Sequence, residues 1–78
     1  MLKYKLIEEN NSRVLYKYFP ENGSESGLVT IDKETGKCDV EKLAPNDEHR
    51  IYALKMFKKL REFLDAKSFD ESGSVAWY

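Results

Sequence analysis

The chain of 78 residues has one cysteine, Cys38, and no apolar run near the ~18 residues that a membrane-spanning helix needs. A single cysteine excludes an intramolecular disulfide and a zinc site built on several cysteines. Small secreted domains usually depend on disulfides, so this count favours an intracellular protein. No basic, apolar leader precedes the first patterned segment. We therefore expect a cytoplasmic protein that makes no membrane contact.

An excess of charge of one sign is also missing, because 13 basic residues are balanced by 14 acidic ones for a net charge of −1. Proteins devoted to nucleic acids or anionic membranes usually carry a surplus of basic residues. The balance argues against such a protein as a whole but permits a local basic patch. The length predicts one small domain over residues 1–78.

Sequence signatures of catalysis are missing as well. The chain has no Gly-x-Ser-x-Gly elbow and no Gly-rich phosphate loop. His49, the only histidine, is predicted on the apolar stripe of a helix and has no partner at a metal-binding spacing. Asp39 and Glu41 flank Cys38 and disfavour its thiolate. We therefore expect no enzymatic activity, no cofactor and no metal.

Residues 2–9 alternate in polarity with the period of two that is typical of β-strands, and residues 13–19 are rich in the aromatic and β-branched residues that strands favour. Asn10 and Asn11 tolerate the positive φ values of a tight hairpin turn, so the two strands are predicted to pair. Residues 28–32 form a third strand, and the turn at residues 32–36 leads into a fourth.

The register of the first hairpin decides which side chains share a face. A two-residue loop pairs Leu6 with Leu15 and Leu2 with Phe19 on the core face. The opposite face then collects two lysines and two aromatic rings: Lys3, Lys5, Tyr16 and Tyr18. A three-residue loop would place Lys5 opposite Lys17, and repulsion between like charges disfavours that register.

The second hairpin is predicted from its turn. Asp32 can accept hydrogen bonds from the turn amides, and Gly36 can supply a positive φ. Closing this turn pairs Ile31 with Cys38 and Val29 with Val40 on an apolar face. Cys38 is thereby predicted to act as a small buried apolar residue rather than a nucleophile.

Residues 47–66 are predicted to form an amphipathic helix, with Asn46 or Asp47 as its cap. One stripe of the helix carries the apolar side chains Ala53, Met56, Phe57, Leu60, Phe63 and Leu64. Ile51 and Leu54 fall outside this stripe and are predicted to be exposed.

Residues 74–78 are predicted to form a fifth strand, with Val75 and Trp77 turned toward the helix. If the first four strands alternate in direction and the helix returns the chain to the other end of the sheet, the fifth strand runs antiparallel to the first. The predicted fold is therefore α+β, in the order ββββαβ with sheet order 5-1-2-3-4. Parallel pairing beside the fourth strand, with order 1-2-3-4-5, is the alternative topology.

We expect a small non-enzymatic cytosolic interaction domain that binds an unidentified protein or associates with itself as a homodimer. The candidate interaction face comprises Lys3, Lys5, Tyr16, Tyr18, Ile51 and Leu54. The alternative function is weak binding of single-stranded nucleic acid, with the two tyrosines stacking on bases and the two lysines contacting phosphates.

Overall fold

The computed structural model describes residues 2–20, 25–47 and 49–75. These residues form one antiparallel sheet of five strands and one helix, which confirms the predicted α+β fold and the order ββββαβ. The elements are β1 (Leu2–Glu9), β2 (Arg13–Pro20), β3 (Gly27–Asp32), β4 (Cys38–Lys42), α1 (Ile51–Ala66) and β5 (Ser72–Val75). The sheet order is β4-β3-β2-β1-β5, so the preferred topology is also confirmed.

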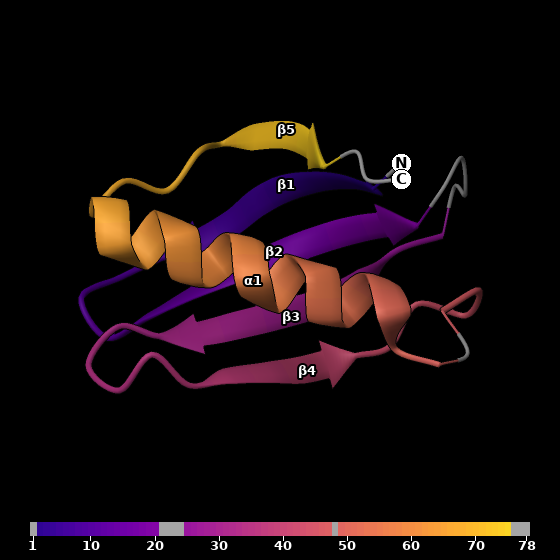
Figure 1. Ribbon diagram of the computed structural model, residues 1–78, viewed down its shortest axis with the longest axis horizontal. Coiled ribbons are helices and arrows are strands. Elements are labelled where there is room, and N and C mark those ends of the chain that lie inside the picture. Colours follow the sequence, from indigo (N-terminus) through magenta and orange to yellow (C-terminus); the bar gives the residue numbers. More distant parts are fainter. Residues whose placement is uncertain (1, 21–24, 48, 76–78) are drawn as a thin grey trace.

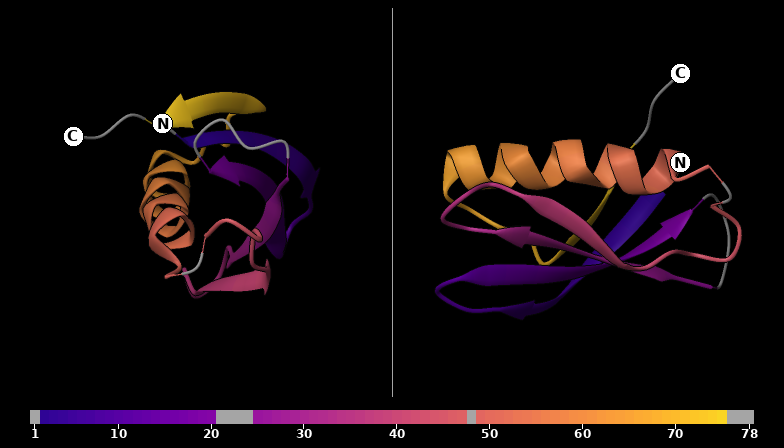
Figure 2. Two further views of the ribbon diagram at one scale, coloured as in Figure 1. Left: turned by 90° about the vertical axis from the view of Figure 1, so that its right-hand side faces the viewer. Right: turned by 90° about the horizontal axis from the view of Figure 1, so that it is seen from below.

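The molecule has two layers, with α1 crossing one face of the sheet diagonally (Figure 1). Seen along the helix, the sheet curls around α1 (Figure 2, left). The other face of the sheet has no described element over it. Successive side chains of a strand point to opposite faces, so each strand contributes alternately to the core and to this second face.

The core lies between α1 and the concave face of the sheet. Its members are Leu2, Tyr4, Val14, Tyr16, Tyr18, Val29, Ile31, Ala44, Ala53, Met56, Leu60 and Phe63. The predicted helical stripe is confirmed, since four of its residues are buried and the other two, Phe57 and Leu64, pack against the core half-buried.

The pairing of β1 with β2 differs from the predicted register. Leu6 lies opposite Tyr16, and Lys5 lies opposite Lys17. The prediction that Leu6 pairs with Leu15 is therefore wrong. A shift of one residue moves a whole strand's side chains to the other face, so the core receives Tyr16 and Tyr18 in place of Leu15 and Phe19.

The turn between β1 and β2 explains the shift. Asn10 N–H donates to the Arg13 carbonyl at 3.0 Å, and Asn10 Oδ1 accepts from the amides of Ser12 and Arg13 at 2.9 Å each. The two-residue loop is therefore Asn11-Ser12, one position later than predicted. A β-bulge between Leu6 and Glu8 then inserts Ile7 and sets the register of the remaining strand.

The second hairpin follows the prediction. Ile31 lies opposite Cys38 and Val29 opposite Val40. Asp32 Oδ1 accepts from the turn amides, and Gly36 has a φ of 75°.

The start of α1 depends on a buried carboxylate upstream of the helix. The helix begins at Ile51 rather than at residue 47. The N-cap residue is Arg50, so the predicted cap position at Asn46 or Asp47 is wrong. The Asp47 carboxylate nevertheless accepts the N–H groups of Tyr52 and Ala53 at 3.1 and 3.0 Å. The same carboxylate accepts from the Tyr18 hydroxyl at 3.1 Å. One side chain thus joins the helix start to β2.

Strand β5 comprises Ser72–Val75, so it begins two residues before the predicted 74–78, of which residues 76–78 lie outside those described. It pairs antiparallel with β1 as predicted. Val75 lies opposite Leu2 and packs against the core. A Cβ added to Gly73 would lie 2.5 Å from Tyr4 Oη, so a larger residue here would displace the buried Tyr4 ring. The predicted orientation of Trp77 concerns a residue outside those described.

Replacement of Asp47 by alanine should destabilise the protein by about 1–3 kcal/mol, because it leaves two helix amides and the Tyr18 hydroxyl without their buried acceptor. Thermal unfolding followed by circular dichroism measures the loss. Asn46→Ala, at an exposed neighbouring position, is the control and should change stability by less than about 0.5 kcal/mol. Equal melting temperatures for the two variants would contradict this account of the helix start.

Candidate functional site

No described element covers the sheet face turned away from α1 (Figure 2), and we call it the uncovered face. Alternation along the strands places these side chains on it: Lys3, Lys5, Ile7, Glu8, Arg13, Leu15, Lys17, Phe19, Leu28, Thr30, Asp39, Glu41 and Lys42. The surface therefore combines apolar, basic and acidic groups.

Four apolar side chains lie on this face. Ile7, at the bulge of β1, is 45% exposed, while Leu15, Phe19 and Leu28 are half-buried among their neighbours. Leu15 and Leu28 occupy the middle of the sheet, on the adjacent strands β2 and β3. The apolar groups therefore lie at the centre of the uncovered face rather than only at its margin.

Three lysines form a row across the sheet, perpendicular to the strands. Lys5 lies opposite Lys17, Lys17 opposite Leu28, and Leu28 opposite Lys42. No carboxylate among the described residues forms an ion pair with these three lysines. Their ammonium groups therefore add to one basic band, which Lys3 extends on β1.

Acidic side chains lie in the next row, toward the turn between β1 and β2. Glu8 lies opposite Leu15, and Thr30 lies between Leu15 and Asp39. Glu41, in a second bulge, is 3.7 Å from the Arg13 guanidinium. Positive and negative charge are thus separated along the strand direction.

The structure divides the predicted interaction residues between this face and the core. Lys3 and Lys5 are exposed on the uncovered face, as predicted. The placement of Tyr16 and Tyr18 beside them is wrong, since both tyrosines are fully buried beneath α1. Four members of the face, Leu15, Lys17, Phe19 and Leu28, were not predicted. Lys17 could have revealed the error in the predicted register, because that register turns its ammonium group toward the core together with Leu15 and Phe19.

The two tyrosines are held by hydrogen bonds at their hydroxyls. Tyr16 donates to the Asp70 carbonyl, and Tyr18 donates to Asp47 while accepting from Ala44 N–H at 3.0 Å. Burial, assisted by the nearby negative charge of Asp47, raises the pKa of Tyr18 from 10.0 to about 12. Burial also raises the pKa of Tyr16 well above its usual value. Neither ring is available to stack on a ligand.

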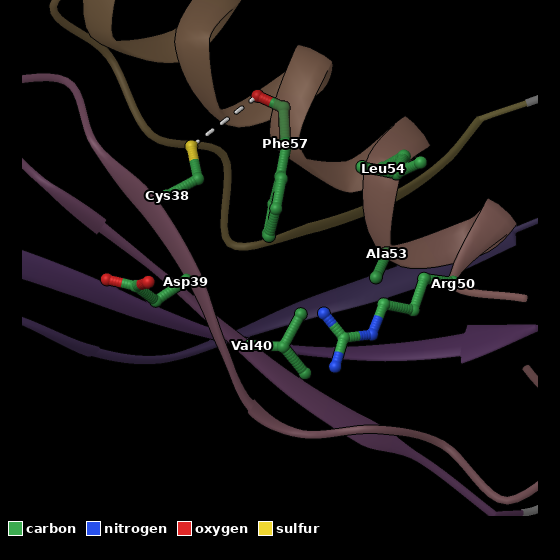
Figure 3. A pocket seen from close by; sticks show the side chains of 7 residues that line it. All are labelled: Cys38, Asp39, Val40, Arg50, Ala53, Leu54 and Phe57. Atoms are coloured by element: carbon green, nitrogen blue, oxygen red, sulfur yellow. Dashed lines mark hydrogen bonds between the residues drawn. The ribbon is translucent and has the colours of Figure 1, made fainter.

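Ile51 and Leu54 lie on α1, on the opposite side of the molecule from the uncovered face. They are 51% and 58% exposed, as predicted. Leu54 lines a shallow groove between α1 and β4, together with Arg50 and Val40 (Figure 3). The six predicted residues therefore do not form a single surface.

Cys38 also lines this groove, and its Sγ is 3.8 Å from the Phe57 carbonyl oxygen (Figure 3). Burial raises the pKa of the thiol, which keeps it protonated at neutral pH and matches its predicted apolar role. His49 is exposed and precedes α1, so its predicted place on the apolar stripe is wrong.

Within residues 2–20, 25–47 and 49–75, no group of three or more histidine, cysteine or acidic side chains could hold a metal ion. The one helix of that part of the chain is too short and too polar to cross a membrane. Comparison with protein-family models, with curated proteins and with solved structures returns no match.

Alkaline titration distinguishes buried tyrosines from exposed ones. Because folding raises the pKa of Tyr18, the resulting stability is complete below pH 10.0 and is lost as the pH rises toward about 12. We expect ultraviolet absorbance to show Tyr16 and Tyr18 ionising only with unfolding. The difference between the titration curves of the wild type and Tyr18→Phe gives the contribution of Tyr18 to the absorbance change. Ionisation of both tyrosines near pH 10.0 in the folded protein would contradict their burial.

Proposed function

We propose that this chain is a small non-enzymatic domain that binds a protein partner through the uncovered face. The observation that carries the proposal is the central pair Leu15 and Leu28 on a face that no described element covers. Contiguous apolar groups rimmed by charge are typical of protein-binding surfaces. The low cysteine count supports a cytosolic location for this interaction.

Charged groups around the apolar centre would determine the orientation of a bound partner. Leu28 lies within the row of lysines, and Leu15 lies within the adjacent row that contains Glu8 and Asp39. Such an arrangement favours a partner with the reverse distribution of charge and disfavours other orientations. The uncovered face therefore offers both an apolar contact area and a charge pattern that orients the partner.

Leu28→Ser should weaken capture of the partner about tenfold or more, because it removes the apolar group at the centre of the face. Immobilised protein is exposed to an extract of its source cells, and the bound protein is identified by mass spectrometry. Leu54→Ser makes the same chemical change on the helix and should leave capture unchanged. Thermal unfolding verifies that both variants fold.

The opposite result, with Leu54→Ser losing the partner and Leu28→Ser retaining it, would move the interaction to the groove beside β4. Capture that is equal for the wild type and both variants would contradict docking at either surface.

A second candidate function is weak binding of single-stranded nucleic acid. Burial of Tyr16 and Tyr18 removes the predicted stacking rings, but Phe19 lies opposite Lys3 and in the row next to Lys17. One ring beside lysines can stack on a base and contact phosphate. Glu8 and the acidic side chains of β4 on the same face oppose a phosphate chain.

Fluorescence anisotropy with labelled oligonucleotides tests this second candidate. Nucleic-acid binding should fall steeply as salt is raised and should be lost in Phe19→Ala. Lys58→Ala, on the exposed side of α1, is the control for a nonspecific charge effect. Binding that is absent at low salt, or unchanged in Phe19→Ala, would remove this candidate.

A further inference from the structure

Charge on the uncovered face is separated along the strands and not across them. Lys5, Lys17 and Lys42 lie in one row, and Glu8 and Asp39 lie in the next row toward the turn between β1 and β2. The two rows are two residues apart on β3, or about 6–7 Å. A rotation that exchanges the two rows therefore makes this surface complementary to itself.

We propose that the uncovered face packs against the same face of a second copy of this chain. This inference rests on the proposed function and names the partner. The two-fold axis lies in the plane of contact, perpendicular to the strands, between the row of Lys17 and the row of Leu15. Each strand then crosses over its own symmetry mate in the opposite direction, as in the face-to-face packing of two sheets.

The rotation brings opposite charges together at both sides of the sheet. Lys42 meets Asp39 of the partner subunit, and Lys5 meets Glu8 of the partner subunit. Because the axis is two-fold, each contact occurs twice. A two-fold axis parallel to the strands would instead place the lysine row over itself, which repulsion disfavours.

The apolar centre also finds a partner in this arrangement. Lys17 lies over Leu15 of the partner subunit, and the aliphatic stem of a lysine can cover such a side chain while its ammonium group stays in water. Glu41 lies near the axis and faces its own symmetry mate. The Arg13 guanidinium, 3.7 Å from Glu41, offsets that repulsion.

The size of the face suits a reversible dimer. The molecule spans 31 × 22 Å perpendicular to its shortest axis (Figure 1), so the projected area available to the face is at most about 680 Å². A standard interface buries ~800 Å² on each partner. Because the sheet curls around α1 (Figure 2), the central strands lie closest to the partner, so the contact area is smaller than this and we expect dissociation in the micromolar range.

Charge reversal tests the pairing. Asp39→Lys and Lys42→Asp each turn both symmetry-related contacts at β4 into repulsion, and each should weaken the dimer about tenfold or more. An equimolar mixture of the two variants should dimerise again, because both β4 contacts of the mixed dimer then join a lysine of one variant to an aspartate of the other. Sedimentation velocity of the full chain from about 5 to about 500 μM measures this.

Matched controls make the same charge changes on the exposed side of α1. Lys58→Asp and Glu62→Lys should each leave the dissociation constant unchanged. Circular dichroism verifies that all four variants keep the wild-type fold, which is expected because every substituted side chain is exposed.

A wild-type chain that stays monomeric at every concentration overturns the proposal, and so does a dimer that survives both substitutions on β4. Dissociation by Ser74→Pro alone would assign the dimer to the free edge of β5. Leu6 N–H donates to Glu71, so alternation turns the Ser74 amide outward. If the pure chain is monomeric while Leu28→Ser still loses a captured protein, the proposed function stands and only the second copy is excluded.

Discussion

The pairing of β1 with β2 decides which side chains lie beneath α1 and which lie in solvent. With Tyr4 opposite Tyr18, the tyrosines of both strands enter the core, and Lys5 and Lys17 face away from it. A shift by one residue would exchange these sets on β2 and turn Lys17 toward the helix. The composition of the core and that of the uncovered face therefore follow from the same register.

Tyrosine suits these core positions because its hydroxyl reaches polar groups at the two ends of α1. Tyr18 contacts Asp47, whose carboxylate also accepts amides from the first turn of the helix. Tyr16 donates to the Asp70 carbonyl in the segment between α1 and β5. The rings fill the core while the hydroxyls connect β2 to the segments before and after the helix. Phenylalanine would supply the volume without these connections.

Elements whose sequence pattern favours one structure over the others were predicted accurately. The helical stripe has a single apolar side, and the turn from Asp32 to Gly36 has residues suited to its backbone angles. Chain direction through a meander and a helix made the position of β5 beside β1 the preferred one, with parallel pairing beside β4 as the alternative, and the structure has the preferred order. In each case local preference and the global fold agree, which is the condition under which sequence patterns are informative.

Strand β2 was harder to predict because both of its faces are largely apolar. Val14 and two tyrosines alternate with Leu15 and Phe19, so periodicity alone does not choose a side. The bulge at Ile7 has no glycine to reveal it. The start of α1 is similarly concealed, since Arg50 adopts a left-handed φ of 58° without being glycine or asparagine. These choices depend on tertiary contacts that a local pattern does not contain.

The uncovered face includes contacts that oppose folding of the isolated chain. Lys5 opposite Lys17 is a repulsive cross-strand pair, and Ile7 is an exposed apolar side chain at a bulge. A domain of 78 residues has a small margin of stability, so such contacts are significant. An acidic group brought over the lysine row, as in the two-fold arrangement, would relieve the repulsion on binding. Relief of this repulsion would then contribute favourably to the free energy of binding.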